Sequence, residues 1–266
     1  MSDAKEYQTI LVSRDGPLLT ITLNRPEVHN AFNETMIVEL QEVIDRTIGE
    51  ARHRVVVLTG SGRSFCAGAD LNWMRRVKDY SYKENLAESK RLADLMYAIY
   101  TLPVPTIARV NGAAIGGGTG LLAACDVIIA AEAAKFSLSE VKLGLVPAVI
   151  SPYVIRRVGE SRCRQLMLTG ERFKADRAKR FGLINTVVPI EDLDDAVEQR
   201  IAQLLTSGPE ALKTCKELLH RVPLMDFQEA RNYTAEVIAR LRISPEGQEG
   251  MAAFLEKRKP EWNRKT

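Results

Sequence analysis

Two apolar stretches in this chain are each followed by a loop of small residues, and the repetition limits the folds open to it. VVVLTG (55–60) is followed by FCAGAD (65–70), and TIARV (106–110) is followed by IGGGTG (115–120). A short helical segment then leads to a third apolar run, VIIAA (127–131). Buried strands that alternate with glycine-containing loops and helices build a parallel sheet covered by helices. The order therefore predicts an α/β core.

The segments that flank this core carry simpler patterns. Residues 7–26 alternate as two strands about a turn at 15–17. Residues 34–50 have the apolar spacing of a helix, with Asn33 as its N-cap. From about Val149 onward the pattern is almost entirely helical. We therefore expect an α/β core over residues 1–200 and a helical region over residues 201–266.

Charge and cysteine content narrow the classes of function. The 266 residues carry a formal net charge of +3, which is too small to indicate a nucleic-acid protein. Four isolated cysteines form no CxxC pair and no cluster with histidine, so we expect no metal site. Such scattered thiols favour a cytoplasmic protein. The first residues lack the apolar core of a signal peptide, and no run of about 18 apolar residues could span a membrane.

Three consecutive glycines, Gly116 to Gly118, have three interpretations. Residues 118–123 satisfy the dinucleotide pattern G-x-G-x-x-A, but the first of these glycines stands seven residues beyond the expected strand, and the helix that follows is too short. A tight structural turn explains one or two glycines. An anion site explains all three, because bare amides at a helix N-terminus can hydrogen-bond a ligand oxygen. If that oxygen belongs to a forming enolate, a second donor is needed, and the N–H of Ala69 is the candidate.

Five segments, taken in order, resemble the crotonase (enoyl-CoA hydratase/isomerase) superfamily. They are LNRPEVHNAF (23–32), FCAGADL (65–71), RVNGAAIGGGTGL (109–121), FSLSEVKLGLVPA (136–148) and EGMAAFLEKRKPEW (249–262). The resemblance implies a β-β-α spiral core with a helical C-terminal trimerisation region, assembled as a homotrimer or homohexamer. It also implies an acyl-CoA substrate, with no metal and no separate cofactor, because CoA arrives as part of the substrate.

The resemblance also implies a set of site residues. The thioester oxygen would lie between the N–H groups of Ala69 and Gly117, and Glu140 in SLSEVKLG would move protons. His29, in the segment before the first helix, is a further candidate for contact with the coenzyme. Residues expected to contact the substrate or coenzyme are Arg25, Val28, Ala67, Asp70, Leu71, Gly116, Phe254 and Lys257, of which the last two match positions at the nucleotide end, in some cases on a neighbouring subunit's ligand.

One catalytic position departs from the family pattern of two glutamates, because Gly120 stands in place of the first. A lone Glu140 could serve both proton transfers of a hydratase, or it could move a proton between C2 and C4 in a Δ3,Δ2-enoyl-CoA isomerase. Another group could also replace the missing carboxylate, or the protein could bind acyl-CoA without catalysis. Since glycine removes bulk, we also expect room for a branched or polar acyl chain.

A narrower resemblance concerns the acyl chain. FCAGADLNWM, GGGTGL and SEVKLGLVPAVISPYV are similar to bacterial methylglutaconyl-CoA hydratases of leucine breakdown, a label that also covers short-chain enoyl-CoA hydratases. Arg75 and Arg76 could meet the distal carboxylate of such a substrate. RNA binding, which one relative achieves through a lysine-rich first helix, is not expected, because residues 33–50 contain no lysine.

Overall fold

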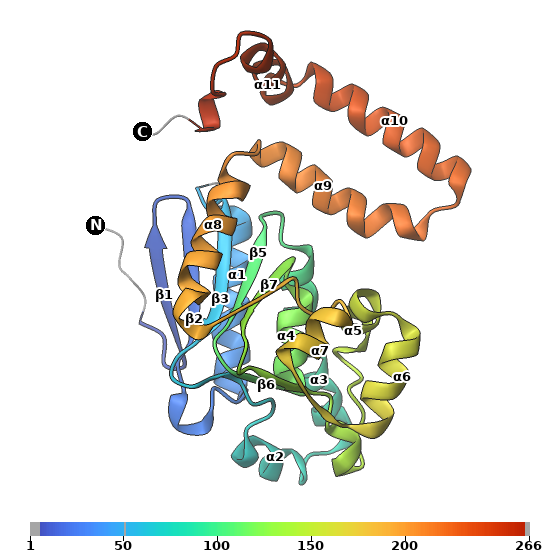
Figure 1. Ribbon diagram of the computed structural model, residues 1–266. Coiled ribbons are helices and arrows are strands. Elements are labelled where there is room, and N and C mark those ends of the chain that lie inside the picture. Colours follow the sequence, from blue (N-terminus) through green and yellow to red (C-terminus); the bar gives the residue numbers. More distant parts are fainter. Residues whose placement is uncertain (1–5, 51, 264–266) are drawn as a thin grey trace.

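The computed structural model describes residues 6–50 and 52–263 (Figure 1). Residues 1–5 and 264–266, at the outer ends of the two expected regions, lie outside the described residues, as does Ala51. The chain forms two sheets, and the larger has the strand order β1-β2-β3-β5-β7-β10. These strands are β1 (Ile10–Asp15), β2 (Leu18–Leu23), β3 (Val55–Gly60), β5 (Thr106–Val110), β7 (Val127–Ala131) and β10 (Thr186–Val188).

The larger sheet is parallel except at one edge, where β1 pairs antiparallel with β2 through the predicted turn at 15–17. All six residues of β3 are buried, and they alternate between two apolar clusters. Val56 and Leu58 belong to the larger cluster, whereas Val55 and Val57 belong to the smaller one. A strand that is buried on both faces needs a continuous apolar run, which is the pattern that VVVLTG shows.

The smaller sheet has the order β4-β6-β8-β9. Its strands are β4 (Ser64–Cys66), β6 (Ala113–Ile115), β8 (Lys135–Ser137) and β9 (Arg172–Lys174). In each of three successive turns, the chain leaves a strand of the larger sheet, adds a strand to the smaller one and then enters a helical segment. This arrangement confirms the expected β-β-α spiral core.

The sequence did not predict the smaller sheet. Residues 65–70 were expected to be a loop, yet β4 occupies 64–66, and the region after Val149, expected to be helical, contains β9 and β10. These two expectations are wrong because strands of three residues are too short to show a period of two.

Helices cover both faces of the larger sheet (Figure 1). α1 (Glu34–Gly49) packs against α3 (Tyr82–Thr101), which also contacts α4 (Gly117–Ala124), and the buried side chains of these helices join the larger cluster. α8 (Leu193–Leu205) contacts β3, β5 and β7, with Leu193 and Val197 in the smaller cluster. Asn33 begins α1 as predicted, because its side chain accepts a hydrogen bond from Met36 N at 2.9 Å.

The remaining helices lie around the core or project from it. α9 (Pro209–Arg221), α10 (Phe227–Ile243) and α11 (Pro245–Leu255) extend away from the sheets (Figure 1). The expected boundary at 200/201 falls within α8, which is a continuous helix on the core, and the two-region division stays a prediction. Around the core lie α2 (Leu71–Val77), α5 (Ser151–Val158), α6 (Glu160–Thr169) and α7 (Ala175–Arg180), together with 3-10 turns that include η1 (Pro26–Val28) and η2 (Glu140–Leu143).

Two cations, the buried Lys216 and the half-buried Arg54, join the C-terminal part of the chain to the core. Lys216 on α9 forms an ion pair with Asp126 at 2.6 Å and donates to Val104 O. Arg54, just before β3, donates to the carbonyl oxygens of Leu205, Ser207 and Trp262. These contacts fix where the C-terminal part leaves the core.

Three of the four cysteines, Cys66, Cys125 and Cys163, are buried free thiols, and Cys215 on α9 is an exposed one. Burial raises the pKa of Cys66 and of Cys125 to about 12. Among residues 6–50 and 52–263, none of the helices has the length and apolar character that a membrane crossing requires.

Candidate active site

The first small-residue loop is held by a short parallel bridge between Phe32 and Ala69. Phe32 N donates to Gly68 O at 2.7 Å, and Asp70 N donates to Phe32 O at 2.8 Å. Because the bridge uses groups on either side of Ala69, the Ala69 N–H points away from Phe32. Ala69 is exposed, so this amide is accessible to a ligand.

An ion pair between Arg25 and Asp70 also holds this loop in place. Arg25 contacts the Asp70 carboxylate at 2.7 Å and also donates to Ala31 O. The other Asp70 oxygen accepts from Asn72 N and Trp73 N, which caps α2. Burial opposes ionisation of Asp70, but the hydrogen bonds from Arg25 and the two amides outweigh it and lower its pKa. With its side chain only 3% exposed, Asp70 positions the loop.

The glycine run is the N-terminal turn of α4, and its glycines meet different neighbours. Gly116 has a φ of 52° and donates through its N–H to Ser137 O at 2.8 Å. A Cβ on Gly117 would stand 3.4 Å from the ring of Phe32. A Cβ on Gly118 would overlap the carbonyl of Cys66, so α4 packs directly on β4. The run therefore combines an unusual backbone turn with a close approach of helix to sheet.

The two loops lie against each other. A Cβ on Gly68 would stand 2.8 Å from Ile115 O and 3.8 Å from Gly117 N. Within the described ranges, neither the Ala69 N–H nor the Gly117 N–H donates a hydrogen bond to a protein acceptor. Two amides without a protein acceptor, on adjacent loops and one of them at a helix N-terminus, are groups of the kind that can stabilise an oxyanion.

Glu140 lies beside these donors. It begins η2, directly after β8, and a Cβ on Gly116 would stand 2.9 Å from its Oε1. Its Oε2 is buried and has no hydrogen-bond partner among the described residues. Burial raises the pKa of this carboxyl, and a hydrogen bond to its own backbone amide only partly offsets the effect. The expectation of a carboxylate at the glycine turn thus agrees with the fold, whereas a solvated surface position does not.

The space beside Gly120 is filled. A Cβ on Gly120 would overlap the Cβ and Cγ2 atoms of Ile150, whose side chain is only 3% exposed. The expectation that this glycine leaves room for a branched or polar acyl chain is therefore wrong. Sequence reasoning missed Ile150 because it lies thirty residues further along the chain, and nothing in the segment SEVKLGLVPAVISPYV marks it as a neighbour of Gly120.

The other expected residues divide into two groups. Arg25, Val28 and His29 lie in the segment that the Phe32–Ala69 bridge holds beside Ala67 and Leu71, since Ala67 N donates to His29 O. Arg76 pairs with Glu34 at 3.7 Å, and Arg75 donates to Asn72. By contrast, Phe254 and Lys257 belong to the α11 end of the molecule, which lies opposite α2 (Figure 1). One copy of the chain does not bring them to the glycine turn.

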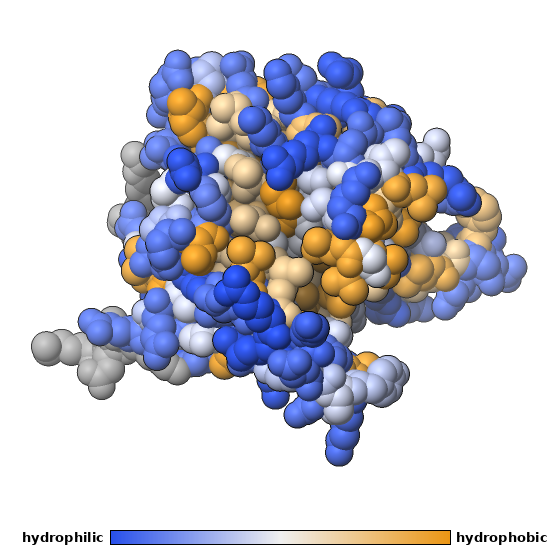
Figure 2. All heavy atoms as spheres, turned by 90° about the horizontal axis from the view of Figure 1, so that it is seen from below, coloured by the Kyte–Doolittle hydropathy of each residue, from blue (hydrophilic) through white to orange (hydrophobic). Residues whose placement is uncertain are grey.

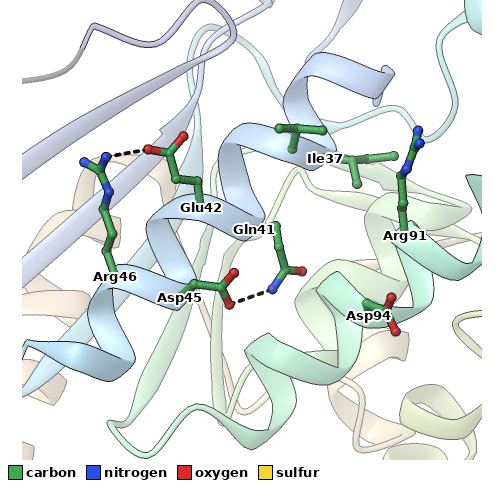
Figure 3. Close-up of a pocket in the computed structure, with 8 residues that line it drawn as sticks. Ile37, Gln41, Glu42, Asp45, Arg46, Arg91 and Asp94 are labelled. Atoms are coloured by element: carbon green, nitrogen blue, oxygen red, sulfur yellow. Dashed lines mark hydrogen bonds and ion pairs between the residues drawn. The ribbon is translucent and has the colours of Figure 1, made fainter.

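A groove of about 600 Å³ between α1 and α3 lies away from this site. Figure 3 shows Ile37 together with polar and charged side chains, with Gln41 hydrogen-bonded to Asp45 and Arg46 paired with Glu42. Val38 lines the groove as well. It contains none of the expected site residues. Among the described residues, no group of three histidine, cysteine or acidic side chains is placed to hold a metal ion.

The chain is similar to known proteins along nearly its whole length. Residues 14–265 match the family model described as enoyl-CoA hydratase/isomerase. A crotonyl-CoA hydratase of Syntrophomonas wolfei is 33% identical over 95% of this chain and 97% of its own length. A 2,3-dehydroadipyl-CoA hydratase of Escherichia coli is also 33% identical, over 95% and 98%. The crystal structure of an enoyl-CoA hydratase from Shewanella pealeana superposes with a TM-score of 0.93, at 42% identity and 97% coverage of both chains.

Proposed function

This chain belongs to the enoyl-CoA hydratase/isomerase family, and we propose that it adds water across the double bond of a 2-enoyl-CoA thioester. The observation that carries the proposal is the placement of Glu140. A carboxyl group with one buried oxygen that has no partner among the described residues stands close to the glycine turn, where the Gly117 amide has no protein acceptor. Amides stabilise the negative charge of an enolate, and a carboxylate of raised pKa can both accept and return a proton.

The proposed reaction needs one carboxylate. Glu140 takes a proton from water as the oxygen bonds to C3, and electrons move through C2 to the thioester oxygen. That oxygen, now an enolate, is held by the N–H groups of Ala69 and Gly117. When the carbonyl re-forms, C2 takes the proton back from Glu140. Atoms balance, since one water is added and the carboxylate is regenerated.

Hydration of crotonyl-CoA, followed by loss of the enoyl absorbance, tests the proposal. Glu140→Ala should lower the rate by about 10²–10⁴, the usual contribution of a general acid–base group. Glu132→Ala is the matched control, because Glu132 is an exposed glutamate on the segment after β7. A wild-type chain that binds CoA thioesters yet converts no enoyl-CoA would instead support a non-catalytic acyl-CoA binder.

The second candidate function is Δ3,Δ2-enoyl-CoA isomerisation. The specific observation in its favour is that Ile150 fills the space beside Gly120, where the family pattern has its first glutamate. Moving one proton from C2 to C4, or the reverse, needs a single carboxylate and no bound water. Conversion of a 3-enoyl-CoA together with no hydration of any 2-enoyl-CoA would favour this function.

The proposed assembly is a homotrimer or homohexamer. Several large apolar side chains of the projecting helices are exposed, and Phe254 and Lys257 would reach a coenzyme only on a neighbouring copy. Lys257 also has a φ of 54°, where glycine is favoured, and residues kept under backbone strain are often functional. Light scattering gives the oligomeric state. The exposed apolar side chains concerned are Leu219, Leu224, Phe227, Ile243, Phe254 and Leu255.

The specificity for the acyl chain of the substrate can be measured directly. We propose a short or branched 2-enoyl chain, such as methylglutaconyl-CoA in leucine degradation, in a cytoplasmic protein. Relatives that share the same 33% identity carry names with different acyl chains, so identity alone does not choose among them. Comparing crotonyl-CoA with methylglutaconyl-CoA, in wild type and in Arg75→Ala, tests whether a distal carboxylate is recognised. Arg76 is already paired with Glu34, which makes Arg75 the better candidate.

A further inference from the structure

Gly116 and Gly120 lie one helical turn apart, and a different side chain stands against each. Gly120 N donates to Gly116 O at 3.1 Å, which closes the first turn of α4 on its N-cap residue, although the φ of 52° at Gly116 is not helical. The Glu140 carboxylate stands against Gly116 and Ile150 stands against Gly120. The carboxylate and the isoleucine therefore stand at the two ends of the first turn of α4.

The side chain of Ile150 cannot move out of this space without a shift of its backbone. Its Cβ and Cγ2 both occupy the space that a side chain at position 120 would need, and a rotamer change does not move Cβ. Its backbone is fixed at the start of α5, where its carbonyl accepts from Tyr153 N and Val154 N, each at 3.2 Å. The side chain also belongs to the larger apolar cluster.

We propose that Ile150 is a positioning residue of the site, which excludes a second carboxylate and bulk water from the Gly120 end of this turn of α4, while the reacting water reaches Glu140 from the substrate side. One buried carboxylate is then left to perform every proton transfer. The catalytic part of this inference rests on the proposed hydratase function, whereas the packing part does not.

The charged groups nearby do not account for the raised pKa of the Glu140 carboxyl group. Burial raises its pKa, and no charged side chain contributes to that shift. α4 itself carries no titratable residue. The titratable groups on the elements around Glu140 are Lys142 on η2, Tyr153, Arg156 and Arg157 on α5, and Glu160, Arg162, Cys163 and Arg164 on α6, which packs against η2.

A stability comparison tests the packing without any substrate. Gly120→Ala should lower Tm clearly in the wild-type background, because the new Cβ meets Ile150. In the Ile150→Gly background the same change should be neutral or favourable, since alanine favours helix over glycine. Ile150→Ala should give no such relief, because its Cβ remains. Equal effects of Gly120→Ala in the wild-type and Ile150→Gly backgrounds would overturn the packing inference.

A control keeps this test decisive if Ile150→Gly does not fold. Gly49 is the last residue of α1, and a Cβ there meets nothing within 4 Å. Gly49→Ala should leave Tm nearly unchanged. If Gly120→Ala were tolerated as well as Gly49→Ala, Ile150 would not fill the space.

The pH dependence of kcat/KM tests the positioning role. Ile150→Ala should admit bulk water near Glu140 and lower the pKa of its carboxyl group, so the acid limb of the profile should move to lower pH. Ile150→Val keeps a β-branched side chain at this position, so its acid limb should stay where it is in the wild type. Val154→Ala, a truncation of another buried residue on α5, should lower Tm without moving the limb. An unmoved limb in Ile150→Ala refutes the role. If wild type hydrates no enoyl-CoA, the hydratase proposal fails, and the Tm comparison still decides the packing.

Discussion

At the scale of single residues, burial of the Glu140 carboxyl group reduces the stability of the fold. One of its oxygens is buried without a partner, and burial raises its pKa above the usual 4.5. The ionised form therefore destabilises the native state at pH values above the raised pKa. Where the group is protonated in both the native and unfolded states, that destabilisation disappears.

Glu140→Gln should accordingly raise Tm at about pH 7–8, because the amide carries no charge to desolvate. The gain should shrink as pH falls through the raised pKa and vanish well below the usual 4.5, where both states of the wild type are protonated. Melting curves across this pH range measure the effect, and the exposed Glu132→Gln should show none of it. A Glu140→Gln variant that melts lower than wild type at pH 8 would contradict this account.

At the scale of elements, α4 is fixed at both ends. Near its N-terminus, the buried Thr119 hydroxyl donates to Ala114 O at 2.7 Å and lies 3.1 Å from Ser137 O, the acceptor of the Gly116 amide. Thr119→Val keeps the shape but loses the donor, so the free energy of unfolding should fall by about 1–3 kcal/mol. Urea denaturation measures this, with Thr119→Ser as the control that keeps the hydroxyl. Equal losses in both variants would assign the effect to packing.

At the other end of α4, the Arg157 guanidinium donates to the carbonyl oxygens of Ala123, Cys125 and Asp126. A cation at a helix C-terminus is favourable, and these carbonyls have few other partners. Arg157→Met should lower the free energy of unfolding by about 2–4 kcal/mol. The neighbouring Arg156 is exposed, so Arg156→Met should cost little in the same denaturation experiment. A small loss in Arg157→Met would show that water replaces the cap.

Element length decides how much of the fold could be predicted. β3, β5 and β7 are continuous apolar runs and α1 has a clear helical period, and the structure confirms all four elements. The smaller sheet was missed because β4, β6, β8 and β9 are stabilised by pairing with one another and not by local pattern. Similarly, the glycine loops and Glu140 carry local motifs, whereas Ile150 acts through a contact that only the packing of α5 on α4 creates.

At the scale of the whole molecule, Arg54 joins the core to two parts of the C-terminal region. Arg54→Ala should speed limited proteolysis after α8. If Phe254 and Lys257 contact the coenzyme, it should also raise KM with kcat little changed, by about tenfold for a loss of ~1.4 kcal/mol. Arg52→Ala is the control, since Arg52 is exposed and pairs only with Glu50. A fall in kcat alone would place the effect at the glycine turn.

The distribution of buried and exposed thiols allows the protein to be labelled at one position. Cys66, Cys125 and Cys163 are shielded, and Cys215 is the one accessible thiol in the described chain, on a helix of the projecting region. A maleimide dye or spin label should therefore attach at a single place without any engineered substitution. Because that place belongs to the part of the chain proposed to meet its neighbours, energy transfer or dipolar spectroscopy between labelled copies would report how they associate in solution.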